Sequence, residues 1–141
     1  MKRIFIYSLH IFLLHLISCS DSSYESNIPD VRFRVKIDLQ NDPFLRAPGN
    51  YKVFDYGGYK GLLVYNLDGN IFYAYDLACT HENGAHVITS KKQGSEPTII
   101  CETCGSHFNL ITAGAPIKAP ALYPLRSYSC TRSNISIWVT N

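Results

Sequence analysis

The sequence contains no segment in which apolar residues recur at the spacing of an amphipathic helix, and this absence argues against a helical domain. It also contains no glycine-rich phosphate-binding loop and no recognisable nucleophile triad, so nothing indicates nucleotide chemistry or triad hydrolysis. Its 141 residues suffice for one compact domain and little more. The chemistry must therefore come from a small number of other side chains.

A basic run or stripe is missing as well. The chain has 13 lysines and arginines against 11 aspartates and glutamates, and two of the basic residues, Lys2 and Arg3, lie in a leader that we expect to be removed. The mature chain then carries 11 basic and 11 acidic side chains. Because binding to nucleic acid requires a concentrated positive surface, we exclude nucleic acid as a partner.

Residues 1–18 have the features of an export signal. A short basic start precedes a mostly apolar stretch, Ile4–Ile17, which is shorter than the roughly 20 residues of a membrane-spanning helix. The sequence LISC at 16–19 resembles the lipobox of bacterial lipoproteins, whose cysteine is lipidated and becomes the first residue of the mature protein. This resemblance implies export and a lipid anchor at Cys19, and we expect attachment to a bacterial cell membrane, the outer membrane being favoured. Plain secretion and an uncleaved anchor helix remain alternatives.

After Cys19 the chain divides into a polar tether, residues 19–30, and a domain, residues 31–141. Alternating or continuous apolar residues predict strands at 31–39, 51–55, 61–65, 71–75, 97–100 and 135–139. Asp68-Gly69, between two of these runs, is a strong hairpin signal. The pattern predicts an all-β fold, an antiparallel sandwich or barrel of short strands.

Two loops carry the residues suited to chemistry. Cys79-x-His81 and Cys101-x-x-Cys104 together supply three thiolates and one imidazole, a set suited to a tetrahedral metal ion or an iron–sulfur cluster. Cysteines of an exported protein either pair as disulfides or bind a metal, and these spacings favour ligands. Cys130 stands apart from both loops, and we expect it to be buried as a small apolar residue.

The order of these motifs resembles the Rieske [2Fe–2S] domain over roughly residues 60–141. That family has C-x-H in one loop and C-x-x-H-G-x-x-F/Y-D in another, followed by a Thr-Gly turn, Gly-Pro-Ala and Pro-Leu-x-x-Tyr. This chain has CTH at 79–81, CETCGSHFN at 101–109, TAG at 112–114, APA at 119–121 and PLRSY at 124–128. The resemblance implies a Rieske-like β-fold with a small two-loop metal-binding subdomain and a [2Fe–2S] cluster.

The chain departs from the family at the site itself, because Cys104 stands where the second histidine is expected. A rival register would pair Cys104 with His107 as C-x-x-H, but the residues that follow would then lose their match. We therefore predict the metal ligands Cys79, His81, Cys101 and Cys104. The first loop carries one residue more than the usual C-x-H-x-G-A, which leaves His86 open as a substitute ligand.

The predicted function is a membrane-anchored one-electron carrier with a modified [2Fe–2S] cluster and an unidentified redox partner protein. A thiolate in place of an imidazole adds negative charge beside the iron, which should lower the reduction potential. A structural zinc site and a metal-free binding module remain alternatives. We do not expect an enzyme, since any catalysis would need a partner protein.

Overall fold

The computed structural model describes residues 26–88 and 91–141. The predicted export signal and the lipidation site Cys19 lie outside these residues. None of the helices in the described part of the chain has the length and apolarity needed to cross a bilayer. The elements, in chain order, are β1 (Arg34–Asp38), α2 (Pro43–Arg46), β2 (Tyr51–Phe54), β3 (Leu62–Asn66), β4 (Phe72–Asp76), the 3₁₀ turn η2 (His81–Gly84), β5 (Gln93–Gly94), β6 (Thr98–Ile100), β7 (His107–Asn109), β8 (Ala115–Lys118), β9 (Ser127–Ser133) and β10 (Ser136–Thr140).

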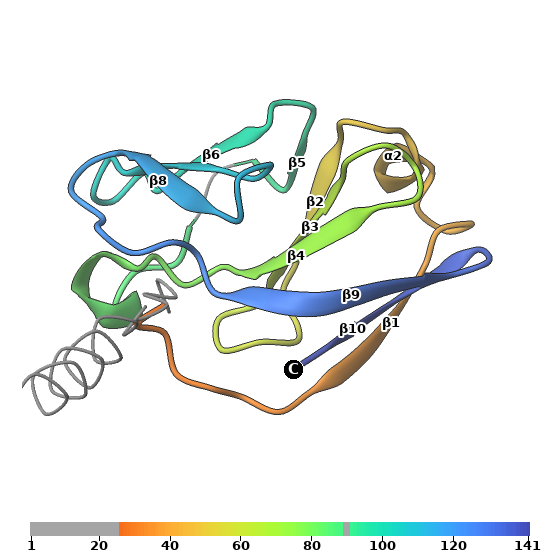
Figure 1. Cartoon of the computed structure of the whole chain (residues 1–141), viewed down its shortest axis with the longest axis horizontal. Coiled ribbons are helices and arrows are strands. Elements are labelled where there is room, and N and C mark those ends of the chain that lie inside the picture. Colours follow the sequence, from red (N-terminus) through yellow and green to blue (C-terminus); the bar gives the residue numbers. More distant parts are fainter. Residues whose placement is uncertain (1–25, 89–90) are drawn as a thin grey trace, which may run out of the picture.

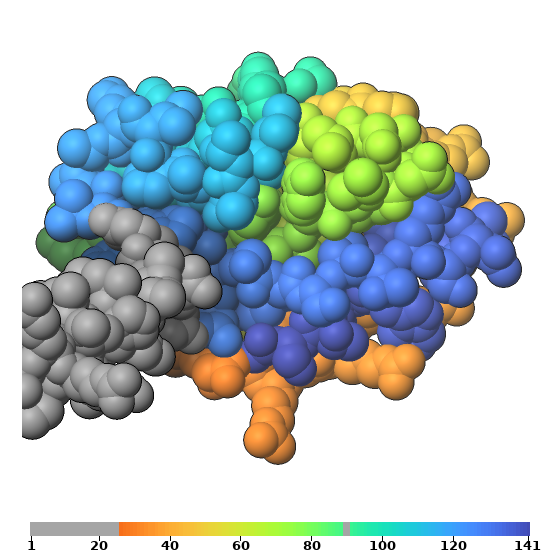
Figure 2. Space-filling view, in the orientation of Figure 1, coloured from red at the N-terminus to blue at the C-terminus, as the bar shows by residue number. Residues whose placement is uncertain are grey.

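The strands form two antiparallel sheets, which confirms the predicted all-β fold. A curled seven-stranded sheet has the order β1-β10-β9-β4-β3-β2-β5, and a three-stranded sheet has the order β6-β7-β8 (Figure 1). On the face shown in Figure 2, the small sheet, cyan to light blue, lies directly against the β3–β4 hairpin, light green. The small sheet carries the second cysteine loop, and the first cysteine loop follows β4 of the large sheet.

The β3–β4 hairpin forms where the Asp-Gly signal predicts it. Its strands pair in register from Leu62 opposite Asp76 to Asn66 opposite Phe72. In the turn, the Asp68 carboxylate accepts the backbone N–H groups of Asn70 and Ile71 at 2.8 and 2.7 Å. Gly69 adopts a φ of 92°, which a side chain would strain.

Strand β3 is buried on both faces and separates two apolar clusters. Leu62 and Val64 point into the interior of the curled sheet, where they meet residues of β1, β9 and β10. Leu63 and Tyr65 point the other way, into a cluster that contains Cys79 and Cys101. Two of the cysteines predicted as metal ligands therefore belong to the packed apolar layer that joins the two sheets.

The structure describes only residues 26–30 of the predicted tether, residues 19–30. Within them Ile28 packs against the domain and is only 3% exposed, whereas Pro29 and Asp30 are exposed. The polar composition of this stretch predicted a tether. The burial of Ile28 could not be predicted, because a single apolar residue forms no pattern. A short helix, α2, also escaped prediction, since four residues are too few to show helical periodicity.

Candidate metal centre

The first cysteine loop is closed at its base by a short antiparallel pairing. Cys79 N–H donates to His86 O at 2.9 Å, and Ile88 N–H donates to Leu77 O at 2.7 Å. The loop of residues 79–86 therefore projects from a fixed base at the end of β4.

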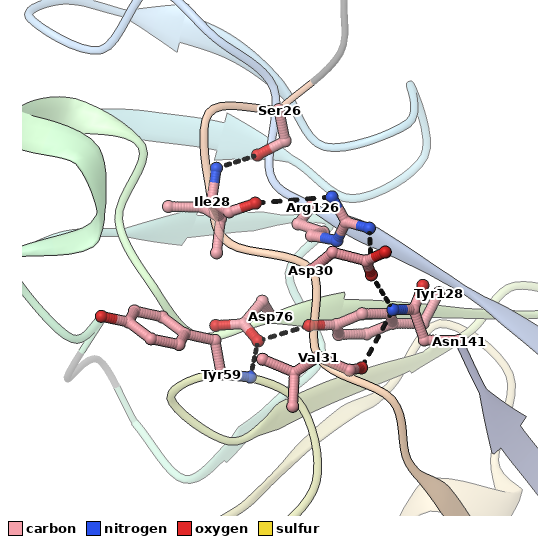
Figure 3. A network of polar contacts seen from close by, with 9 residues as sticks. All are labelled: Ser26, Ile28, Asp30, Val31, Tyr59, Asp76, Arg126, Tyr128 and Asn141. Atoms are coloured by element: carbon pink, nitrogen blue, oxygen red, sulfur yellow. Dashed lines mark hydrogen bonds and ion pairs between the residues drawn. The ribbon is translucent and has the colours of Figure 1, made fainter.

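A buried carboxylate at the end of β4 stabilises the backbone that leads into this loop. Asp76, 0% exposed, accepts the backbone N–H of Ala78 at 2.7 Å and that of Tyr59 at 2.5 Å. It also accepts the Tyr128 hydroxyl at 2.7 Å (Figure 3). The tyrosine and backbone donors satisfy the hydrogen-bonding capacity of this buried carboxyl group. This network raises the pKa of Tyr128, because burial and the neighbouring carboxylate both disfavour the phenolate.

The second cysteine loop is the tight connection between β6 and β7. Cys101 N–H donates to Ser106 O at 2.9 Å, and Gly105 N–H donates back to Cys101 O at 2.7 Å. Gly105 has a φ of 75°, a conformation that glycine adopts without strain. This turn brings Cys104 back over Cys101.

The three cysteines of the two loops converge. The sulfur atoms of Cys79, Cys101 and Cys104 all lie within 4.8 Å of one another, and those of Cys79 and Cys104 are 3.6 Å apart. Cys79 and Cys101 are buried and Cys104 is half-buried. A group of soft donors, two of them shielded from water, suits iron–sulfur or zinc binding.

The surroundings shift these thiols in opposite directions. Burial raises the pKa of Cys79, although the backbone N–H of His81 works against this. Burial also disfavours the Cys104 thiolate, but the hydroxyl and backbone N–H of Ser106, together with the neighbouring Cys101 and Cys79 thiols, outweigh it, so the pKa of Cys104 is lowered. Cys104, the residue that departs from the family pattern, therefore has an environment prepared for a thiolate.

A third segment, residues 121–123, covers the two loops. Ser106 Oγ accepts the Ala121 N–H at 2.9 Å and lies 3.1 Å from Cys104 Sγ. Thr80 Oγ1 donates to Tyr123 O at 2.6 Å. Ser106, which was not among the predicted site residues, is fully buried and links this segment to Cys104. Its place after Gly105 in the motif was the available signal.

The histidines stand outside the cluster of sulfurs. Among residues 26–88 and 91–141, the grouped donor atoms are those of the three cysteines alone. His81 Nε2 lies 3.7 Å from Glu82 Oε1, and His86 Nε2 lies 3.0 Å from Glu82 Oε2. His107 is in β7, paired with Ile100. The structure thus brings together Cys79, Cys101 and Cys104, and it leaves His81 at the rim of the same loop.

Cys130 lies on β9, away from this centre. It packs against the cluster inside the curled sheet and is partly buried. Burial raises the pKa of its thiol to about 12. These features are those of a packing residue.

Comparison with known proteins identifies relatives of this arrangement. The family model of the Rieske [2Fe–2S] domain matches residues 37–129. A ferredoxin of Sphingomonas yanoikuyae B1 is similar in structure, with a TM-score of 0.56 and 21% identity over 77% of this chain and 99% of that chain. The plasma membrane Rieske protein PetC3 of the cyanobacterium Synechocystis PCC 6803 has a TM-score of 0.57 and 28% identity over 76% of this chain and 99% of that chain. The search of curated proteins found no match.

Proposed function

The chain belongs to the Rieske [2Fe–2S] domain family, and from this premise we propose that it is a lipid-anchored one-electron carrier with a [2Fe–2S] cluster held by three cysteines and one histidine. The family and its ferredoxin-like neighbours support an iron–sulfur electron carrier. The observation that carries the proposal is the convergence of Cys79, Cys101 and Cys104 within 4.8 Å. His81 is the proposed fourth ligand, because it belongs to the C-x-H motif and lies on the same loop.

When bound, such a cluster supplies reversible one-electron oxidation and reduction. The residues around it have three tasks. Cys79 and Cys101 supply buried thiolates, and the hydroxyl and backbone N–H of Ser106 favour the thiolate of Cys104. The covering segment, residues 121–123, limits the access of water to the sulfurs.

Electron transfer requires a partner to approach the centre. On the covering segment, Leu122 is 75% exposed and Tyr123 is 42% exposed. Exposed aromatic and aliphatic side chains next to a buried centre suit a transient protein interface. We therefore place the docking surface for the redox partner protein at residues 121–123, beside the cysteine loops.

Redox titration of the full chain, purified without oxygen, tests the function. A third thiolate puts more negative charge on the cluster than two imidazoles allow, so the reduction potential should lie below about −150 mV, the lower end of the two-histidine centres. A potential in the high, positive part of the Rieske range would contradict the proposed ligand set. A colourless protein with one bound zinc would contradict electron transfer altogether.

A further inference from the structure

Residues 26–31, which we call the N-terminal strap, lie against the first cysteine loop. The Asn27 side-chain N–H₂ donates to Thr80 O at 2.9 Å and to Asn83 Oδ1 at 2.8 Å. Thr80 separates Cys79 from His81, and Asn83 follows two residues after His81. The Asn27 amide group therefore links the residue before His81 to a residue shortly after it. Asn27 itself lies 53 residues before Thr80 in the chain.

The loop that Asn27 contacts has a backbone that needs such support. Glu82 and Asn83 are consecutive non-glycine residues with φ values of 56° and 53°. The left-handed conformation is unfavourable for residues with a side chain, and it persists only when its surroundings fix it. This stretch also contains the residue by which the loop exceeds the usual family pattern.

The strap also packs against the same loop through an apolar side chain. Ile28 is 3% exposed, and a Cβ on Gly84 would lie 2.9 Å from the Ile28 Cδ1 atom. Gly84 has a φ of 80°, a backbone conformation that favours glycine, and its lack of a side chain lets Ile28 pack closely against the loop. The extra length of the loop is thus accommodated by close contact with the strap.

The strap is fastened at its other end as well. Arg126 donates to Ile28 O at 3.4 Å and to the Asp30 carboxylate at 2.8 Å. The Asn141 side chain donates to Val31 O at 2.9 Å and to Asp30 (Figure 3). These contacts hold the strap between the start of β9 and the C-terminus, so that it can act as a fixed support.

We propose that the N-terminal strap is part of the metal centre and that Asn27 is a positioning residue, which holds the first cysteine loop and His81 in the arrangement needed for metal binding. This inference rests on the proposed function and deepens it. Asn27 does not touch the metal. Its amide nitrogen carries both hydrogen bonds, and its buried Oδ1 has no donor among the described residues, so the role depends on the amide as a donor.

The test compares Asn27→Asp and Asn27→Ala in the full chain. Asn27→Asp keeps the size but removes the donor, and Asn27→Ala removes it without adding charge. Asn70→Asp is the matched control, because Asn70 lies on the distant β3–β4 turn and uses only its oxygen, as an acceptor from Arg132.

The first readout needs no metal. In the metal-free protein, hydrogen exchange of the Ala85 amide, which donates to Glu82 O, should become roughly tenfold faster or more in both Asn27 variants. Exchange in β3 should stay unchanged, and Asn70→Asp should match wild type at both places. Unchanged exchange at Ala85 would overturn the proposal, and so would an equal loss of protection in β3, since the role would then be general stability.

The second readout uses the loaded protein. Both Asn27 variants should alter the absorption spectrum and the reduction potential while Asn70→Asp leaves them unchanged. Wild-type spectra and potentials in both variants would overturn the positioning role. If the bound metal is zinc, the proposed function fails, whereas the exchange measurement still decides whether the strap supports the loop.

Discussion

At the scale of single residues, Cys104 determines what the centre can be. Its sulfur lies 3.6 Å from that of Cys79, and Ser106 favours its thiolate. A neutral imidazole at this position would remove one negative charge from the cluster. The identity of residue 104 should therefore set the reduction potential.

Replacing Cys104 by His should recreate a two-histidine centre. We expect the reduction potential of Cys104→His to rise by on the order of 100 mV, because two imidazoles stabilise the reduced cluster. Redox titration followed by absorption checks this. His107→Ala is the control: a large change in its potential would favour the rival ligand pair Cys104 and His107.

Cys130 should make the fold sensitive to alkaline pH. Burial raises its pKa from 9.0 to about 12, so between these values the unfolded chain loses a proton that the folded chain keeps. The unfolded state then binds fewer protons, and the free energy of unfolding falls as pH rises. Urea unfolding at about pH 8 and about pH 10.5 should show a smaller loss for Cys130→Ala than for wild type. An equal loss in both proteins would assign the effect to other groups, such as Tyr75 and Tyr128, whose pKa values are also raised.

Motif spacing predicted which cysteines lie close together, but it could not predict the residues whose hydrogen bonds hold the cysteine loops in place. Cys79, Cys101 and Cys104 were identifiable because C-x-H and C-x-x-C are local patterns of ligand residues. Asn27 was not, because a single asparagine in a polar stretch gives no signal, and its partners lie 53 and 56 residues away. Supporting hydrogen bonds of this kind depend on the tertiary fold alone.

At the scale of elements, the junction between β4 and the first loop depends on Asp76. Its carboxylate accepts the N–H groups of Tyr59, Lys60 and Ala78 and the hydroxyl of Tyr128. These contacts join the turn before β3, the end of β4 and strand β9. The network stabilises the base from which Cys79 projects.

Asp76→Ala should therefore destabilise the protein by about 3 kcal/mol, because it leaves several buried donors without an acceptor. Urea unfolding measures the change. The exposed Asp55→Ala is the control, and its effect should stay within about 0.5 kcal/mol. A loss below 1 kcal/mol in Asp76→Ala would show that the network contributes little.

The strands that could be predicted are those with a repeating pattern. Alternation identified β1 and β10, and the Asp-Gly signal identified the β3–β4 hairpin. Strand β5 has two residues, and β8, Ala115–Lys118, contains a proline and is largely exposed. Neither has the length or the alternation that a sequence pattern needs, so both follow from pairing with their neighbours.

At the scale of the whole molecule, the described chain begins at the end that holds the cysteine loops. In Figure 1 its first residues, orange, lie next to η2, green. Asn27 lies eight positions after Cys19, a distance that a fully extended chain spans in at most about 28 Å. A lipid anchor at Cys19 would thus keep the metal centre close to the membrane surface, which favours a redox partner located there.

The lipid anchor is itself testable through Cys19→Ser. We expect this variant to lose a lipid-sized mass and to move from the membrane fraction to the soluble fraction, since no other anchor is proposed. Intact-mass measurement and fractionation check this, with Cys130→Ser as the control that keeps its lipid. A Cys19→Ser protein that stays in the membrane would favour the uncleaved anchor helix.

Metal analysis combined with absorption spectroscopy of the full chain, purified without oxygen, decides whether the protein is an iron–sulfur electron carrier. We expect two irons and two acid-labile sulfides per chain and a visible absorption that bleaches on one-electron reduction. One zinc per chain and no visible absorption would contradict it.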